Sequence, residues 1–228
     1  MPKNLFFKIL LSLYFLIYFV NISYSNPITA WEKAATSVVS VLPTWPGFKK
    51  PGFGAPPGTA PEGTGIVISS LGHILTASHV VKRANLIEIR DINGNKFNAK
   101  LILDDPNTDL AIIKAEIDIT PINISKDKPK IASSACLISN SFGLDLGITC
   151  GVVSAIGRKN TGFNKIENFI QTDAAANPGS SGGALVDKNG ELIGMMSGIF
   201  TKDTDTNAGV NFAVSSELIL KIIPFAIN

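Results

Sequence analysis

Histidine and cysteine are scarce in this chain of 228 residues, which contains two of each. Metal sites in proteins are built from such side chains at short, regular spacings, and His73, His79, Cys136 and Cys150 show no such spacing. We therefore expect no metal and no cofactor. An excess of charge of one sign is also lacking, since 20 Lys and Arg residues oppose 18 Asp and Glu residues. This balance provides no basic surface for nucleic acid or for an anionic membrane.

Long apolar runs are missing as well. The longest, Ile9–Val20, has 12 residues, whereas a helix that spans a bilayer needs about 20. Lys3 and Lys8 precede this run, and the small residues Ser23 and Ser25 follow it. This pattern predicts a secretory signal peptide over residues 1–25, a mature chain from Asn26, and export to the periplasm or beyond. An uncleaved membrane anchor over residues 5–22 is the alternative.

The two cysteines remain open to two interpretations. An exported chain with an even number of cysteines favours a disulfide, and a hairpin centred near Gly143 would place Cys136 opposite Cys150. The alternative is a pair of unpaired, buried thiols. Neither cysteine lies in a G-x-C-G-G loop, so a cysteine nucleophile is excluded.

The most informative stretch that is present is Asn177–Leu185, with the sequence N-P-G-S-S-G-G-A-L. Asn-Pro opens a turn, and three glycines allow the tight backbone conformations that an exposed serine requires. Ser181 is the candidate nucleophile, and the backbone N–H groups of Gly179 and Ser181 are candidate donors to an oxyanion. A serine hydroxyl needs an imidazole to take its proton and a carboxylate to orient that imidazole.

Both partners are found upstream, in the order His, Asp, Ser. His79 lies in T-A-S-H-V, where an apolar strand ends, and Asp109 lies in T-D-L-A-I-I-K, before another strand. With N-P-G-S-S-G-G, these motifs resemble the trypsin-like serine proteases, and most closely their HtrA/Deg branch. The resemblance implies that His79 is the general base, that Asp109 orients it, and that Ser181 attacks polypeptide substrates. His73 instead lies in a hairpin and is expected to have no catalytic role.

Short runs of β-branched and apolar residues, separated by turn signals, recur along the chain and favour an all-β barrel or sandwich. Among the strands they predict are Leu86–Arg90, Gly151–Ile156 and Phe169–Thr172. The family resemblance sharpens this to two six-stranded antiparallel β-barrels with a short C-terminal helix. The expected halves are residues 26–118 and 119–228. A helix over residues 215–223, ended by Pro224, closes the chain. Two hairpin-like stretches, from Gly65 and from Gly183, carry glycines seven apart and could be repeats of one barrel half or convergent turn chemistry.

Residues 43–65 contain six prolines and six glycines and cannot form a regular element. A mobile surface loop is the simplest interpretation. The family resemblance offers another, in which this loop and the N-terminal segment contact a second copy and form a homo-oligomer. HtrA-type proteins usually continue into PDZ domains, and the sequence ends at Asn228 without one, so we expect substrate capture to depend on other means.

The resemblance also places a substrate pocket. Its floor is expected at Ala175, its wall near Met196, and its substrate-pairing edge at Ser197, Gly198 and Ile199, with Asn211 close enough to add a polar contact. No acid stands among these residues, which predicts small or medium aliphatic side chains before the cleaved bond. Ser180 stands where digestive enzymes have an acid that pairs with a freed N-terminus, so that zymogen switch is not expected. A protein-binding or chaperone role, with a triad that never assembles, is the alternative function.

Overall fold

The computed structural model describes residues 27–48, 61–199 and 208–227. The predicted signal peptide, the alternative anchor and the middle of the 43–65 loop lie outside these residues. Within them, no helix has the length and apolar character needed to cross a membrane.

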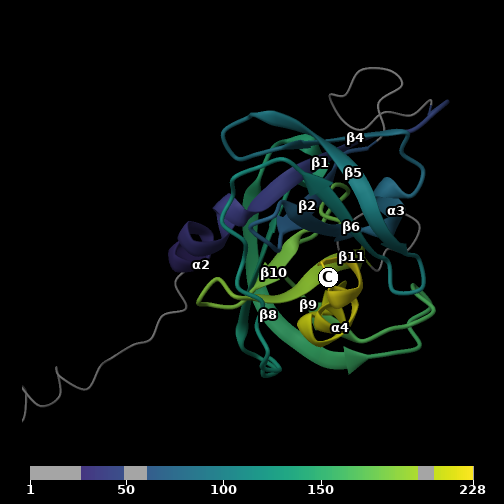
Figure 1. The fold of residues 1–228 in the computed structure, drawn as a ribbon. Helices are drawn as coiled ribbons and strands as arrows, with labels where there is room; N and C mark the ends of the chain where they lie inside the picture. The colour runs from purple at the N-terminus through teal and green to yellow at the C-terminus, as the bar shows by residue number, and fades with distance from the viewer. Residues whose placement is uncertain (1–26, 49–60, 200–207, 228) are drawn as a thin grey trace, which may run out of the picture.

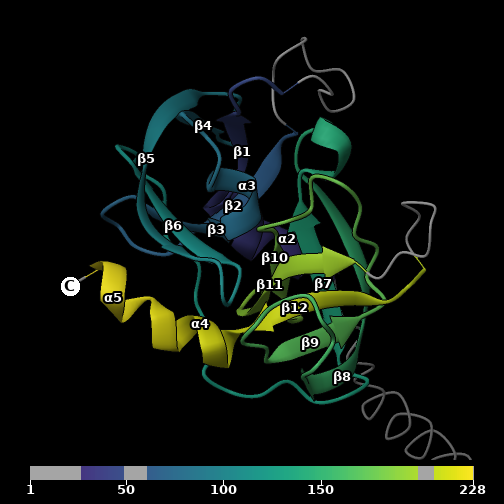
Figure 2. The same ribbon diagram turned by 90° about the vertical axis from the view of Figure 1, so that its right-hand side faces the viewer.

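The strands form two closed, six-stranded antiparallel barrels, as predicted (Figures 1 and 2). The strands of the first barrel are β1 (Val38–Thr44), β2 (Gly63–Val67), β3 (His73–Ala77), β4 (Leu86–Arg90), β5 (Lys96–Asp105) and β6 (Leu110–Ala115). Those of the second are β7 (Ser134–Ser139), β8 (Gly147–Arg158), β9 (Phe169–Thr172), β10 (Ala184–Val186), β11 (Leu192–Ile199) and β12 (Asn211–Ser215). Pairing of β1 with β4 closes the first barrel, and pairing of β10 with β7 closes the second.

The alternation of side chains along a strand explains how the barrels pack together. On β7, Ala135 and Leu137 belong to a core cluster inside the second barrel, whereas Cys136 and Ile138 belong to a larger cluster shared with the first barrel. On β11, Met195 belongs to the shared cluster and the neighbouring Met196 to the cluster inside the second barrel. These strands are therefore apolar on both faces, and an apolar core joins the two barrels.

Helices are few and short. Helix α2 (Pro27–Ala34) leads through the 3-10 turn η1 (Ala35–Ser37) into β1, and α3 (Ser78–Val81) follows β3. A second 3-10 turn, η2 (Ser141–Gly143), joins β7 to β8. At the end of the chain, α4 (Ser216–Ile222) begins with the Ser215 hydroxyl accepting a hydrogen bond from Leu218 N–H.

Pro224 ends the closing helix near the predicted position, but it also begins a further turn, α5 (Pro224–Ile227). Proline fits the first turn of a helix because its missing N–H has no partner there. In Figure 2, α4 and α5 run from the second barrel toward the first, where α5 contacts β5. The C-terminal helices thus contact both barrels.

The two hairpins with similar glycine spacing are not equivalent parts of the fold. The barrels share one strand order, β1-β2-β3-β6-β5-β4 and β7-β8-β9-β12-β11-β10, so β2 and β3 correspond to β8 and β9. The second glycine pair lies instead in the hairpin of β10 and β11. The two hairpins are therefore not repeats of one element, although the two barrels do share one strand order.

Cys136 and Cys150 form a disulfide. They are directly paired across β7 and β8, with Cα atoms 4.1 Å apart, so the predicted hairpin register is confirmed. The interpretation as two unpaired thiols was wrong. The bond closes the base of a hairpin whose tip, η2, faces the Asn177–Leu185 stretch.

Candidate active site

His79 and Asp109 are brought together where β3 ends and β6 begins. His79 is the second residue of α3, and Asp109 immediately precedes β6, which is paired with β3. Asp109 has a backbone φ of +60°, a conformation that Asp tolerates better than most residues. This turn directs its carbonyl oxygen to the N–H of Ser78, at 3.0 Å, and so fixes the start of α3 against the aspartate.

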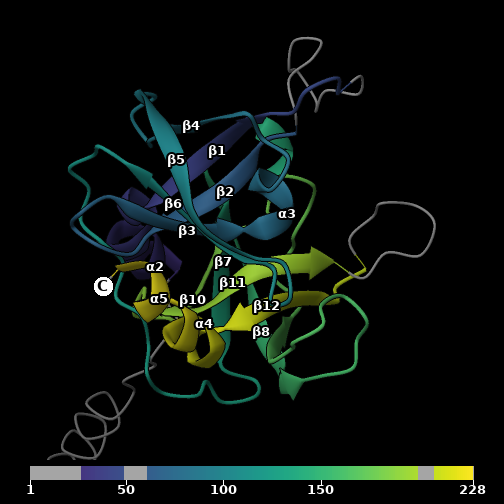
Figure 3. The ribbon, with the colours of Figure 1, turned by 45° about the vertical axis from the view of Figure 1, so that its right-hand side comes forward.

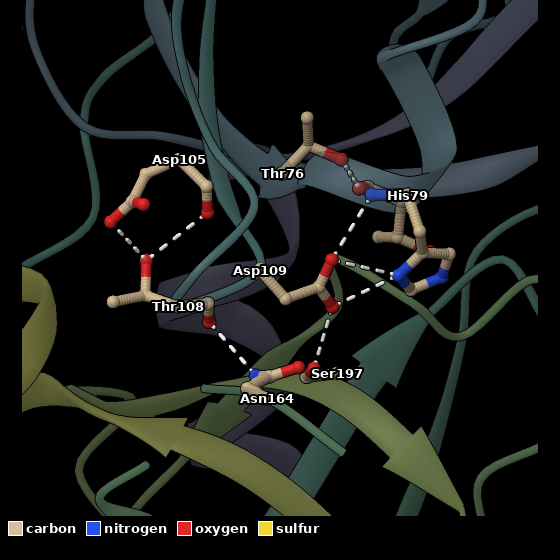
Figure 4. Close-up of polar contacts among 8 residues, drawn as sticks. Thr76, His79, Asp105, Thr108, Asp109, Asn164 and Ser197 are labelled. Carbon is tan, nitrogen blue, oxygen red and sulfur yellow. Dashed lines mark hydrogen bonds and ion pairs between the residues drawn. The ribbon is translucent and has the colours of Figure 1, made fainter. Parts of the chain in front are cut away.

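The Asp109 carboxylate is the centre of the polar cluster in Figure 4. The His79 ring nitrogen Nδ1 lies 3.0 and 2.9 Å from its two oxygens, and the His79 backbone N–H donates to Oδ1 at 3.0 Å. The Ser197 hydroxyl donates to Oδ2 at 2.6 Å from β11 of the second barrel. Figure 3 shows α3 and β11 on facing sides of the boundary between the barrels.

This arrangement defines the tautomer of His79. An ionised carboxylate only accepts hydrogen bonds, so a neutral His79 paired with it carries its proton on Nδ1 and keeps a lone pair on Nε2. The Asp109 side chain is 10% exposed and that of His79 43% exposed. The imidazole is therefore accessible, and its orientation is fixed by the buried carboxylate.

Ser181 is half-buried in the turn before β10 and lies close to α3. Gly63 lies between α3 and Ser181. A Cβ atom added to Gly63 would stand 2.7 Å from the Val80 side chain of α3 and 3.4 Å from the Ser181 carbonyl oxygen. Among the described residues the Ser181 hydroxyl has no hydrogen-bond partner, the His79 ring included. Such bonds are often long in a protease without substrate.

Thr64 of β2 fastens the Ser181 turn to the first barrel. Its N–H donates to the Ser181 carbonyl at 2.9 Å, and its hydroxyl donates to the Gly179 carbonyl at 2.8 Å while accepting from Asn140 N–H at 2.9 Å. The sequence analysis missed this residue. A signal was present in Gly63-Thr64-Gly65, because adjacent glycines in a strand often mark a close approach of another backbone.

The backbone of the turn leaves two N–H groups without protein acceptors. In the described part of the chain, neither Gly179 N–H nor Ser181 N–H donates a hydrogen bond to protein, whereas Ser180 N–H donates to Asn177 O. The Pro178 carbonyl accepts from Phe142 N–H at 2.6 Å, and the Ser180 carbonyl accepts from Gly183 N–H at 2.9 Å. Each trans peptide directs its N–H opposite to its carbonyl, so these bonds fix the directions of both N–H groups.

Ser180 is buried beneath the turn in a cluster of three hydroxyl groups. Its Oγ lies 3.0 Å from Ser139 Oγ and 2.9 Å from Ser141 Oγ, and it accepts a bond from Asn177 N–H at 3.1 Å. The side chain adjacent to Ser181 thus binds the hairpin around η2. It points away from solvent, so the structure separates the two neighbouring serines clearly.

The expected pocket residues lie beside the turn, on the loop before it and on β11 and β12. The Ala175 carbonyl accepts from the Thr149 hydroxyl at 2.7 Å, and the amide of Asn211, which is buried, donates to the Ala174 carbonyl at 2.8 Å. Met196 is buried in the core of the second barrel, and its backbone bonds to Gly182 and Gly183. A Cβ atom added to Gly198 would stand 3.1 Å from the Phe163 ring, while the side chain of Ile199 lies outside the described residues.

A search of the described residues for metal sites finds no group of three or more His, Cys, Asp or Glu side chains that could hold an ion. The polar chemistry of this site consists of one imidazole, one carboxylate, serine hydroxyls and backbone N–H groups.

Comparison with known proteins finds a match to the family model of the trypsin-like peptidase domain over residues 63–195. The periplasmic serine endoprotease DegP of Salmonella typhimurium is 40% identical over 161 residues, which are 69% of this chain and 34% of that relative. The periplasmic pH-dependent serine endoprotease DegQ of Escherichia coli is 40% identical over 160 residues, 68% of this chain and 35% of that relative. This chain therefore spans about a third of the length of these relatives.

Solved structures show the same likeness. The HtrA-type protease AlgW, determined with a tripeptide, has a TM-score of 0.80 and 33% identity, covering 89% of this chain and 64% of that one. The serine endoprotease from Yersinia pestis has a TM-score of 0.73 and 33% identity, covering 89% of this chain and 66% of that one.

Proposed function

This chain belongs to the trypsin-like peptidase family, with relatives in its HtrA/Deg branch, and we propose that it is a serine endopeptidase in which His79, Asp109 and Ser181 act as the triad. The observation that carries this proposal is the contact of His79 Nδ1 with both carboxylate oxygens of Asp109, which orients the imidazole and leaves Nε2 available to another group. The same residues in the same order resemble the triad of the family.

The proposed reaction proceeds through an acyl-enzyme. Ser181 Oγ attacks the scissile carbonyl carbon while His79 Nε2 takes the hydroxyl proton, and the carbonyl oxygen becomes an oxyanion between the N–H groups of Gly179 and Ser181. The C–N bond then breaks as the imidazolium returns its proton to the leaving amine. Water, deprotonated by His79, attacks the ester and releases the acid and free Ser181. Asp109 stabilises the imidazolium and keeps its proton on Nδ1.

Polypeptides are the proposed substrates, and unfolded proteins are the best candidates because an extended chain can pair with the edge of β11 at residues 197–199. Ala175, Met196, Ser197, Gly198, Ile199 and Asn211 carry no charge, so a buried Lys or Arg would have no partner there. We propose small or medium aliphatic residues before the scissile bond. Discrimination among them should be modest, because a methylene contributes only about 0.8 kcal/mol when buried.

Replacing Ser181 with alanine should lower turnover of an unfolded protein by a factor on the order of 10⁶, as loss of the nucleophile does in other serine proteases. The assay measures peptide release from a reduced, unfolded substrate together with covalent labelling by a serine-directed phosphonate. Ser180→Ala is the matched control, because its hydroxyl is buried and bonded; labelling of that variant should persist.

Equal loss of labelling in Ser180→Ala, or unchanged turnover in Ser181→Ala, would exclude the assignment. An unlabelled wild-type protein would instead favour the binding or chaperone role. Mapping the cleavage sites in the same digest tests the pocket. A majority of cuts after Lys or Arg would contradict an uncharged, apolar pocket.

We also propose self-association through the N-terminal segment and the 43–65 loop. The described start of that loop bonds to α3, since Trp45 Nε1 donates to the Val80 carbonyl at 3.1 Å, and Trp45 packs edge-on against Phe48 at 5.2 Å. A contact made by this loop would thus lie next to His79. Light scattering of the mature protein measures its mass, and a monomer at all concentrations would exclude this proposal.

A further inference from the structure

Arg90, the last residue of β4, lies between two carboxylates from different parts of the chain. Its guanidinium donates to Glu62 at 3.0 and 3.4 Å and pairs with Asp145 at 2.7 Å. Glu62 precedes β2 of the first barrel, whereas Asp145 follows η2 in the second. The side chains of Arg90 and Glu62 are 17% and 18% exposed, so their pair is largely removed from water, while that of Asp145 is 76% exposed.

Glu62 carries this connection further into the molecule. Its Oε2 accepts a bond from the Asn140 side-chain amide at 2.6 Å, and the Asn140 residue is fully buried. The Asn140 backbone N–H in turn donates to the Thr64 hydroxyl, which donates to the Gly179 carbonyl. A continuous chain of hydrogen bonds thus leads from Arg90 to the turn that carries Ser181.

The segment between Asn140 and Asp145 is bonded to the first barrel at both of its ends. Asn140 is bonded through Glu62 and Thr64, and Asp145 is bonded directly to Arg90. Between these points, Phe142 N–H donates to the Pro178 carbonyl and so sets the direction of the Gly179 N–H. Phe142 and Asp145 both have positive φ, +59° and +68°, which non-glycine residues adopt only when their surroundings enforce it.

We propose that Arg90 is a positioning residue for the reaction: by bridging Glu62 and Asp145 it holds residues 140–145 against the first barrel, and thereby keeps the Gly179 N–H directed at the oxyanion. This inference rests on the proposed endopeptidase function. Arg90 touches no reacting atom in this scheme and acts only through the segment it anchors.

The two carboxylates contribute unequally. Burial works to lower the pKa of the Arg90 guanidinium, but the hydrogen bond and charge of Glu62, and then those of Asp145, outweigh burial and raise that pKa. Charges exposed to water are screened by solvent and salt, so the Asp145 contact should contribute less than the Glu62 contact. Loss of Arg90 would leave Glu62 unpaired and free to release Asn140.

The test uses the full mature protein with Arg90→Gln, Arg90→Lys and Asp145→Asn. Lys128→Gln is the matched control, because Lys128 pairs with Glu217 at 3.1 Å on the surface and away from the candidate active site. Phosphonate titration first counts the active sites, and kcat and KM are then measured per titrated site on a peptide with alanine or valine before the cleaved bond. The affinity for a peptide aldehyde, which forms an oxyanion in the site, is measured in parallel.

For Arg90→Gln we expect kcat per site to fall by about 10-fold to 100-fold, less than the 10²-fold to 10³-fold typical for outright loss of an oxyanion donor. KM should change by less than about twofold, and aldehyde affinity should fall in parallel with kcat. Arg90→Lys should recover part of the loss, since it keeps the charge but not the two-pronged bond. Asp145→Asn should lower kcat less, and Lys128→Gln should match wild type.

A purely structural role would lower the melting temperature and the number of titrated sites, but not kcat per site, and that result would overturn the proposal. If Arg90→Gln does not fold, Glu62→Gln replaces it: its carbonyl oxygen still accepts from Asn140, but the charge and the second of the two bonds to Arg90 are lost, and unchanged kcat there would equally overturn the proposal. A wild-type protein that is not labelled would instead refute the endopeptidase function itself.

Discussion

Asp109 and Thr64 each join separate structural elements at the candidate active site. Asp109 accepts bonds from the ring and backbone of His79, from Ser197 and, through its carbonyl, from Ser78, so one side chain and its peptide join α3 to β11. Thr64 plays the corresponding part on the other side of the site, where its N–H and hydroxyl bind the carbonyls of Ser181 and Gly179. The site is thus held from the first barrel at two points.

Replacing Thr64 with valine keeps its shape but removes the hydroxyl, which leaves the Gly179 carbonyl and the Asn140 N–H without a partner. Buried groups left unpaired cost about 1 to 3 kcal/mol each, so we expect the free energy of unfolding to fall by about 2 to 6 kcal/mol. Urea denaturation measures it. Thr64→Ser retains the hydroxyl and should lose only about 1 kcal/mol for the missing methyl group. Equal losses in the two variants would show that the hydroxyl bonds contribute nothing.

The sequence was sufficient to predict His79, Asp109 and Ser181 as candidates because each lies in a local motif. Asn140 and Arg90 could not be predicted, because their contacts join positions far apart in the chain, whereas the glycines on either side of Thr64 were a local signal. The ion pair of Arg90 with Asp145 depends on how the two barrels pack against each other, and no local sequence pattern predicts that packing.

At the scale of elements, the loop between β8 and β9 is organised by one carboxylate. Glu167 accepts from the N–H and hydroxyl of Thr161, at 2.7 and 2.8 Å, and from the N–H groups of Phe163 and Asn164, at 3.0 and 3.1 Å. The loop also reaches the first barrel, where the Asn164 amide donates to the Thr108 carbonyl at 3.0 Å, next to Asp109 (Figure 4).

This cluster predicts a pH-dependent stability. Burial works to raise the pKa of Glu167, but the bonds from Thr161, Asn164 and Phe163 outweigh it and lower the pKa. Because the folded pKa is depressed, the stabilisation is present above the pKa of the unfolded chain, about 4.3, and is lost as the pH falls through the folded value. Glu167→Gln should therefore destabilise the protein at pH 7, by about 1 to 2 kcal/mol, and progressively less below about pH 4.

Thermal unfolding of wild type and Glu167→Gln between pH 7 and pH 3 measures this difference. Glu217→Gln is the control, since Glu217 forms only exposed pairs with Lys128 and Lys221, which contribute little in water. A destabilisation by Glu167→Gln that is constant across this range would contradict the prediction.

Most strands agree with the sequence pattern, and β4 and β9 match the predicted residues Leu86–Arg90 and Phe169–Thr172 at both ends. Their β-branched and aromatic runs are bounded by turn residues, which explains the agreement. Helix α3 could not be predicted, because four residues are too few to show a helical period. Strand β8 extends beyond the predicted Gly151–Ile156 on both sides, since its pairing with β7 and β9 continues past the apolar run.

For the whole molecule, two closed barrels with a shared apolar core account for the even distribution of apolar residues along the chain. The family resemblance predicted this architecture, whereas composition and periodicity alone left a barrel and a sandwich equally open. The apolar contact between the barrels was beyond the reach of the sequence pattern, because alternate residues of β7 face two different cores.

The mature protein should begin near Asn26 and be recovered outside the cytoplasm, because residues 1–25 have the charge and apolar pattern of a signal peptide. N-terminal sequencing of protein extracted from the cell envelope checks this. Intact Met1–Ser25 in the membrane fraction would favour the anchor over residues 5–22 instead. Cytoplasmic protein with its full N-terminus would contradict both.

The Ser181 turn is hydrogen-bonded to Thr64 of the first barrel, so the order in which the barrels fold determines when the proposed catalytic groups first come together. His79 and Asp109 are synthesised and can fold with the first barrel, but the N–H groups of Gly179 and Ser181 take their positions only after the second barrel has closed and docked. If the chain is the endopeptidase proposed above, it therefore cannot complete its oxyanion site before the second barrel has been synthesised and has folded against the first.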